Sequence, residues 1–299
     1  MRVTLIHNPG AGSQGAGQAA RLRRFLRDCG YEVRYQSAKE HGWKAALKKP
    51  TDLVIVAGGD GTVARVTRRM VGRGVPVALL PAGTANNIAR SLGLVERPFE
   101  ELVRLPRDAR RIKLDVGIAA GPWGERYFVE GVGAGLFADL LGIAESGAPK
   151  TRKTPVASGL RRLRDIAARC EPVEIAATLD GRDISGRYLL MEALNLPYVG
   201  PNLHLANDSQ PGDGQLDVVL VTEAERRRLV HYLEHWQENR ERLAVLPTLR
   251  GRRLRIEWTG FALHVDDKLR PKADAEPHKM AGVVEARLED DTVEFLVPA

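Results

Sequence analysis

Cysteine and long apolar runs are scarce in this sequence. Cys29 and Cys170 are the only cysteines among its 299 residues, which excludes a disulfide framework and a cluster of metal-binding thiolates. No run of about 18 apolar residues occurs, so we expect no helix that spans a bilayer. The first apolar run is short and stops at Pro9, unlike the apolar core of a secretory signal. We therefore expect a cytoplasmic protein.

Acidic residues are fewer than basic ones. The chain has 45 lysines and arginines against 38 aspartates and glutamates, which gives a formal net charge of +7. This excess favours anionic partners such as phosphorylated ligands, nucleic acid or acidic membrane surfaces. The sequence contains no zinc-ligand spacing, no Ser-His-Asp order and no nucleic-acid-binding motif. We expect no nucleic-acid partner.

The first third of the chain alternates between short β-branched runs and segments of helical periodicity. In 62–72, for example, Val63, Val66, Met70 and Val71 share one helical face. Strand and helix repeated at this pitch predict a parallel sheet covered by helices. We assign residues 1–115 to an α/β domain. The strands are expected at 2–6, 31–36, 52–59 and 75–83.

Strands predominate from about Arg111 onward. Asp180-Gly181, between two such runs, predicts a tight hairpin turn. Two segments of helical character, 159–170 and 223–246, interrupt the strands. We assign 116–289 to a second, mainly antiparallel β domain with helical insertions.

Three glycine-rich loops follow strands of the first domain. The carboxyl ends of parallel strands lie at one edge of a sheet, where ligands bind. Each loop alone is compatible with a plain tight turn, but three in successive units predict a site where backbone amides hold a polyphosphate. The candidate binding residues are Asn8, Pro9, Gly10, Ala11 and Gly12, then Gly58, Gly59, Asp60, Gly61 and Thr62, then Thr84 and Asn86.

Two common nucleotide sites do not match these loops. No lysine follows a glycine cluster as in G-x-x-x-x-G-K-[ST], and the first loop lacks the dinucleotide spacing. The second loop also contains an acid, Asp60, which a bare phosphate would repel.

Several motifs follow one another along nearly the whole chain. They are HNPGAG, VAGGDGTV, LPAGTANNIAR, KLDVG, YFVEGVGAGLFADLL, N-x-x-x-x-G-P and D-G-x-L-D. Together they resemble the catalytic domain shared by diacylglycerol, sphingosine and ceramide kinases, and the stand-alone bacterial lipid kinases of that family are similar in length. GGDGT alone is shared with NAD kinases, so a kinase of a non-lipid alcohol such as NAD is an alternative.

The resemblance implies a fold and a reaction. The fold is an α/β nucleotide-binding domain, like that of NAD kinase, joined to an all-β sandwich, with the active site in the cleft between them and a strand at about 290–299 returning to the first domain. The reaction is ATP- and magnesium-dependent transfer of the γ-phosphate to a hydroxyl of a diacylglycerol-like or sphingoid-like lipid. Asp60 is implied as catalytic through magnesium, with Asp115 sharing the metal, because the cation reverses the local electrostatics.

A second, structural magnesium is implied at SQPGDGQLD. By position, its ligands are the Asp213 carboxylate and the backbone carbonyls of Gln210 and Gln215. Ligation by oxygen alone suits magnesium. Asp213-Gly214 is also typical of a plain hairpin turn, which is the alternative.

The sequence departs from the family pattern in two places. Ala64 and Arg65 stand where the family has Asn-Glu, and Lys268 stands where it has the acid that accepts the lipid's proton. A protonated lysine is no base. Asp266, or the neighbouring Asp267, is left as the catalytic base. The alternative is a nucleotide- or lipid-binding relative with weakened or lost catalysis.

A basic stretch precedes and includes the first helical insertion. Leu160, Leu163 and Ile166 recur there at helical spacing. Such a segment can lie on anionic lipid, so peripheral contact with the inner membrane face is expected. The alternative is a solvated helix packed on its own domain. The basic residues are Lys150, Arg152, Lys153, Arg161, Arg162, Arg164 and Arg169.

Overall fold

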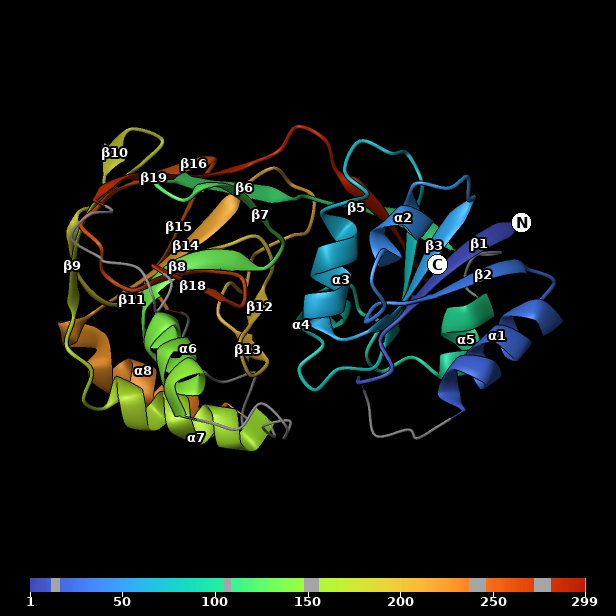
Figure 1. Ribbon diagram of the computed structural model, residues 1–299. Coiled ribbons are helices and arrows are strands. Elements are labelled where there is room, and N and C mark those ends of the chain that lie inside the picture. The colour runs from blue at the N-terminus through green and yellow to red at the C-terminus, as the bar shows by residue number, and fades with distance from the viewer. Residues whose placement is uncertain (12–16, 105–108, 148–155, 237–245, 272–280, 299) are drawn as a thin grey trace. The chain divides into compact units, whose positions relative to one another are not determined.

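Two compact units make up the chain (Figure 1). Unit 1 comprises Met1–Val116 with Asp290–Ala299, and unit 2 comprises Gly117–Glu289. The computed structural model describes residues 1–11, 17–104, 109–147, 156–236, 246–271 and 281–298. Four residues named above, Gly12, Lys150, Arg152 and Lys153, lie outside the described residues.

Unit 1 contains a six-stranded, mainly parallel sheet. Its strands are, in sheet order, β2 (Glu32–Ser37), β1 (Arg2–His7), β3 (Leu53–Gly58), β4 (Val77–Pro81), β20 (Val293–Val297) and β5 (Arg110–Leu114). All neighbours are parallel except β5, which runs antiparallel to β20. The central β3 is buried along its whole length, as its uninterrupted apolar run predicts for a strand covered on both faces.

Five helices of unit 1 are described. They are α1 (Gln18–Asp28), α2 (Trp43–Leu47), α3 (Asp60–Thr67), α4 (Asn87–Ser91) and α5 (Phe99–Arg104). α1 is amphipathic and buries Leu22 and Leu26. α1 and α5 lie side by side (Figure 1), and the ring centroids of Phe25 and Phe99 are 5.7 Å apart. The sequence pattern did not predict α5.

α3 is shorter than the sequence pattern predicts. The expected helical face continued to Met70 and Val71, but the helix ends at Thr67. The amides of Arg69 and Met70 bond carbonyls only three residues earlier, at 2.8 Å each, so the chain tightens into turns. Met70 is nevertheless buried, because these turns keep its side chain on the core side.

Unit 2 contains a twelve-stranded sheet in which every pair is antiparallel. Along the main path the strands are β18 (Lys268–Arg270), β17 (Leu263–Val265), β8 (Gly131–Gly135), β11 (Gly186–Leu194), β9 (Val173–Leu179), β16 (Arg253–Trp258), β19 (Gly282–Leu288), β6 (Gly117–Gly121) and β7 (Gly124–Phe128). β10 (Arg182–Asp183) pairs with β9, and β14 (Leu216–Thr222) pairs with β11 and β15 (Thr248–Gly251). A separate two-stranded sheet joins β12 (Tyr198–Val199) and β13 (Leu203–His204).

The long sheet of unit 2 folds into a β-sandwich. Its pairing changes at β11, where the register with β14 shifts between Tyr188 and Leu190. Side chains from both sides of this change, such as Met191, Ile256 and Val284, belong to one apolar core. Two faces of the same sheet therefore pack against each other, as in sandwiches generally.

The expected hairpin at Asp180-Gly181 is confirmed. The two residues have φ angles of 50° and 82°, the left-handed pair that a two-residue turn of this kind requires. They join β9 to β10, and Asp180 further fixes the turn by accepting the amide protons of Arg252 and Arg253.

Three helices of unit 2 gather on one side of the sandwich (Figure 1): α6 (Leu136–Gly147), α7 (Val156–Ala167) and α8 (Arg226–His235). α6 was not predicted from the sequence. On α7, Leu160, Leu163 and Ile166 are buried in a core shared with α6 and α8, which bears out the alternative of a helix packed on its own domain. Among the described helices none is long and apolar enough to cross a membrane.

We expect the interior position of β20 to make Phe295 essential for unit 1. Its side chain is fully buried, so Phe295→Ala should lower the free energy of unfolding by about 3–5 kcal/mol in urea denaturation. Glu294→Ala is the control. It removes only a half-buried acid and its pair with Arg111, which costs about 0–1 kcal/mol. Equal losses from the two variants would contradict an interior β20.

Candidate functional site

The three glycine-rich loops meet at one edge of the sheet of unit 1. β1, β3 and β4 are parallel neighbours, so their carboxyl ends bring the loops together. The Asn8 amide donates to the Ala57 carbonyl at 2.9 Å, and the Asn8 side chain donates to the Thr62 hydroxyl at 3.0 Å. The Ala82 amide donates to the Gly58 carbonyl at 3.0 Å. The structure thus assembles the described part of the predicted loop cluster.

Glycine is required at two of these positions by the protein itself. A β-carbon on Gly59 would lie 2.8 Å from the Gly83 α-carbon, and one on Gly83 would lie 2.6 Å from the Gly59 α-carbon. The second and third loops therefore touch backbone to backbone. Gly61, in the first turn of α3, differs. A β-carbon there would meet no atom within 4 Å, so packing within the protein does not require glycine at this position.

Asp60 bonds backbone amides of the third loop. Its Oδ1 accepts the Ile88 amide proton at 3.0 Å, and further amides at Asn86 and Asn87 stabilise its charged form. Burial raises the pKa of Asp60, and these amide hydrogen bonds oppose that shift. The carboxylate thereby caps α4, whose own N-cap residue makes no side-chain cap bond. An acid in the second loop thus has a partner inside the protein.

The structure also shows the surroundings of two further predicted site residues, Asn86 and Asp115. Asn86 has a φ of 54°, and its side chain closes the third loop by accepting the Gly83 amide proton at 2.8 Å. Asp115 is buried directly after β5, which β20 separates from β4 in the sheet. Arg65 stacks over Trp43 at 5.3 Å and donates to the Gly61 carbonyl, so this departure from the family pattern lies beside the second loop.

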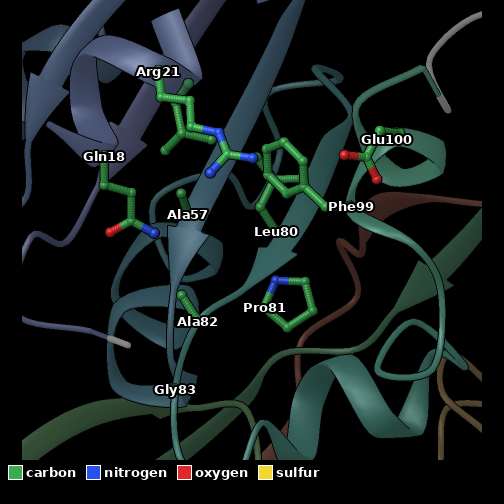
Figure 2. A pocket seen from close by; sticks show the side chains of 10 residues that line it. Gln18, Arg21, Ala57, Leu80, Pro81, Ala82, Gly83, Phe99 and Glu100 are labelled. Carbon is green, nitrogen blue, oxygen red and sulfur yellow. The ribbon is translucent and has the colours of Figure 1, made fainter. Parts of the chain in front are cut away.

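A pocket of about 360 Å³ opens beside the loops (Figure 2). It lies at the carboxyl ends of β3 and β4, with α1 and α5 supplying further walls. The lining residues are Gln18, Arg21, Leu22, Ala57, Leu80, Pro81, Ala82, Gly83, Phe99 and Glu100. Sequence reasoning did not find Gln18, Arg21, Phe99 or Glu100, because no motif marks them.

His7 stands behind one wall of this pocket. It ends β1 and is buried. Its Nδ1 lies 3.2 Å from the Tyr35 hydroxyl, and its Nε2 lies 3.3 Å from Oε1 of Gln18. Burial lowers the pKa of His7 below its ordinary value of 6.5, which favours the neutral ring.

In unit 2, the predicted base Asp266 is already bound by the backbone. It lies in the turn between β17 and β18 with a φ of 49°. Its carboxylate accepts the amide protons of Val129, Glu130 and Gly131 at 3.1, 2.9 and 3.2 Å. The geometry is that of a carboxylate that holds a turn against β8. Exposed Lys268 pairs with exposed Asp267 at 2.8 Å.

A buried acid that the sequence pattern did not mark lies behind this turn. Glu192 Oε1 is 2.8 Å from Nε2 of His264, and both side chains are buried. His264 Nδ1 lies 2.9 Å from the Asp266 carbonyl oxygen, so the pair supports the turn from inside. Burial raises the pKa of Glu192, which His264 opposes.

The loop predicted to hold a structural magnesium contains an ion pair in this structure. Asp213 Oδ1 accepts the Gln215 amide proton at 2.9 Å, and Oδ2 pairs with the Arg250 guanidinium. The Gln210 carbonyl accepts the Asp213 amide proton. Arg250 Nε also lies 3.2 Å from the buried Asp217. A guanidinium therefore supplies positive charge at this loop in the structure.

Comparison with known proteins assigns both units. The family model described as "Diacylglycerol kinase catalytic domain" matches residues 2–119, and the model described as "YegS C-terminal NAD kinase beta sandwich-like domain" matches residues 142–290. These two matches lie on the α/β unit and on the β-sandwich unit, in that order.

Relatives that cover most of this chain agree with the two family models. The diacylglycerol kinase of Bacillus subtilis is 26% identical over 75% of this chain and 74% of its own length. That of Mycobacterium tuberculosis H37Rv is 26% identical over 89% of this chain and 88% of its own. The crystal structure of a diacylglycerol kinase from Bacillus anthracis shares the fold, with a TM-score of 0.69, 21% identity, and 99% and 96% of the two chains covered. The chain therefore belongs to the diacylglycerol kinase catalytic-domain family of lipid kinases.

Proposed function

We propose that this lipid kinase transfers the γ-phosphate of ATP, as its magnesium complex, to a hydroxyl of a diacylglycerol-like or sphingoid-like lipid. The observation that carries the ATP assignment is that the 360 Å³ pocket reaches Gly83, the residue whose backbone touches Gly59. A cavity of this size suits a base and sugar. Because the pocket reaches Gly83, it leads directly to the loops that are proposed to hold the phosphates.

The phosphates would lie at the first turn of α3. Its N-terminal amides carry partial positive charge, and Gly61 leaves open space for a close approach. Thr62 and Asn8, bonded to each other, and the loop residue Thr84 complete the proposed site. Bound magnesium would neutralise charge on the transferring phosphate, and Asp60 and Asp115 are the carboxylates proposed to face it.

Gly61 offers a clean test of this assignment. Gly61→Val should keep the protein folded and weaken ATP binding by about tenfold or more, since one charge-assisted hydrogen bond is worth about 1.5–3 kcal/mol. Gly59→Val is a poor test because it would strike the Gly83 backbone. It serves as the contrasting variant and should lower the Tm. If calorimetry showed that the Gly61→Val variant binds ATP as tightly as the wild type, the proposed phosphate site would be refuted.

Neither residue at the predicted base position is well suited to accept the proton of the lipid hydroxyl. Asp266 has its carboxylate committed to three amides, and Lys268 cannot accept a proton. Phosphoryl transfer depends mainly on orientation and charge neutralisation, while a general base contributes about 10²–10⁴-fold. We therefore propose slow but real turnover. The same two observations favour the second candidate, a relative that binds nucleotide or lipid without turnover.

A turnover assay separates the two candidates. Labelled ATP and a mixed lipid extract should yield labelled lipid slowly, with Lys268→Glu no slower than the wild type. Asp60→Asn should abolish transfer while staying folded, because its amide oxygen still accepts the Ile88 amide proton. A wild type that labels no lipid, together with a Lys268→Glu variant that does, would establish the binding relative.

We also expect the Asp213 loop to be independent of magnesium. The Tm of the nucleotide-free protein should be the same in magnesium and in chelator. Arg250→Met should cost about 1–3 kcal/mol of stability, because it leaves the buried Asp217 without its cation. Arg252→Met, at an exposed position, is the control. A wild-type Tm that rises with magnesium would instead support Asp213, Gln210 and Gln215 as ligands of a structural magnesium.

Membrane contact is proposed to be electrostatic. The apolar face of α7 is buried in its own unit, so no apolar side of this helix can enter a bilayer. Arg161, Arg162 and Arg169 are exposed and available to anionic headgroups. This contact would leave the protein peripheral at the inner membrane face.

A further inference from the structure

The hydrogen-bond partners of His7 determine which of its ring nitrogens carries the proton. Burial favours the neutral ring, which has one N–H group and one acceptor nitrogen. Oε1 of Gln18, 3.3 Å from Nε2, can only accept, whereas the Tyr35 hydroxyl, 3.2 Å from Nδ1, can donate. The chain of bonds therefore runs in one direction: Tyr35 donates to Nδ1, and Nε2–H donates to Gln18.

In this structure the oxygen of the Gln18 amide faces His7. Its oxygen is committed to His7, so its nitrogen, with two N–H donors, faces the other way. Figure 2 shows the Gln18 nitrogen on the side of Ala57 and Ala82, and the oxygen on the far side. Gln18 therefore presents its amide nitrogen to the pocket, while its amide oxygen contacts a buried side chain outside the pocket.

We propose that His7 is a positioning residue that makes Gln18 a hydrogen-bond donor to an acceptor atom on the purine of the bound nucleotide. This inference rests on the proposed ATP site and assigns the base end of it. Glu100 lies on the opposite side of the view in Figure 2 and offers an acceptor. Phe99, Leu22 and Leu80 supply apolar surface for the ring. A purine edge presents both donors and ring-nitrogen acceptors, which matches this arrangement.

The test measures binding of two ligands by calorimetry, ATP and inorganic tripolyphosphate. Gln18→Glu replaces the donor by an acceptor of the same shape and should weaken ATP binding by about tenfold or more. His7→Leu removes both bonds and should weaken it by about 3- to 10-fold. Tripolyphosphate has no base, so its affinity should be unchanged in both variants.

Two further variants separate positioning from mere stability. His7→Gln can keep a donor near the Nε2 position and should retain the wild-type ATP affinity within about threefold, whatever its Tm. Tyr35→Phe keeps the ring and removes the hydroxyl, so it should weaken ATP binding in the same direction even if His7→Leu fails to fold. The double variant His7→Leu/Gln18→Met should bind ATP no more weakly than Gln18→Met alone, because the two residues act through one contact.

The outcomes are distinguishable. A wild type that binds neither ligand overturns the proposed function and this inference with it. A wild type that binds ATP, with unchanged affinity in Gln18→Glu and Tyr35→Phe, overturns only the role of His7 and Gln18. Parallel losses for ATP and tripolyphosphate would also overturn it, since they would show a general disturbance of the loops.

Discussion

The backbone contact between Gly59 and Gly83 is the constraint on which the candidate site of unit 1 depends. It holds the second and third loops closer than any side chain would allow. Asp60 adds its bond to the Ile88 amide, and Asn86 closes the third loop on itself. Loops that are fixed in this way lose little further conformational entropy when a ligand binds, which favours tight and well-oriented binding.

Several acids of this chain are occupied by protein groups. In unit 2, Asp266 holds a turn through three amides, and Asp213 shares Arg250 with Asp217. A buried carboxylate needs such partners, because desolvation without them is costly. Sequence motifs alone cannot separate an acid that meets a ligand from one that satisfies the backbone, since both occur in glycine-rich turns.

The sequence predicted what depends on local patterns. The strand–helix alternation predicted the parallel sheet of unit 1. Asp180-Gly181 predicted the hairpin between β9 and β10 in unit 2. Long-range contacts were beyond reach: Arg250 meets Asp213 from 37 residues away, and α5 reaches the pocket through Phe99 and Glu100. Helix α6 was missed because it directly follows the strand β8, whose glycine-rich sequence ends at Gly135 with a positive φ of 80°. Gln18 contacts a buried histidine in another element, and no motif encodes that contact.

The position of β20 has a consequence for the order of folding during synthesis. β4 and β5 are made early, but the strand that lies between them is made only after the whole of unit 2. On the ribosome, the first 116 residues therefore present two unpaired strand edges while the sandwich is translated. The α/β unit is completed last, although its residues are the first to emerge.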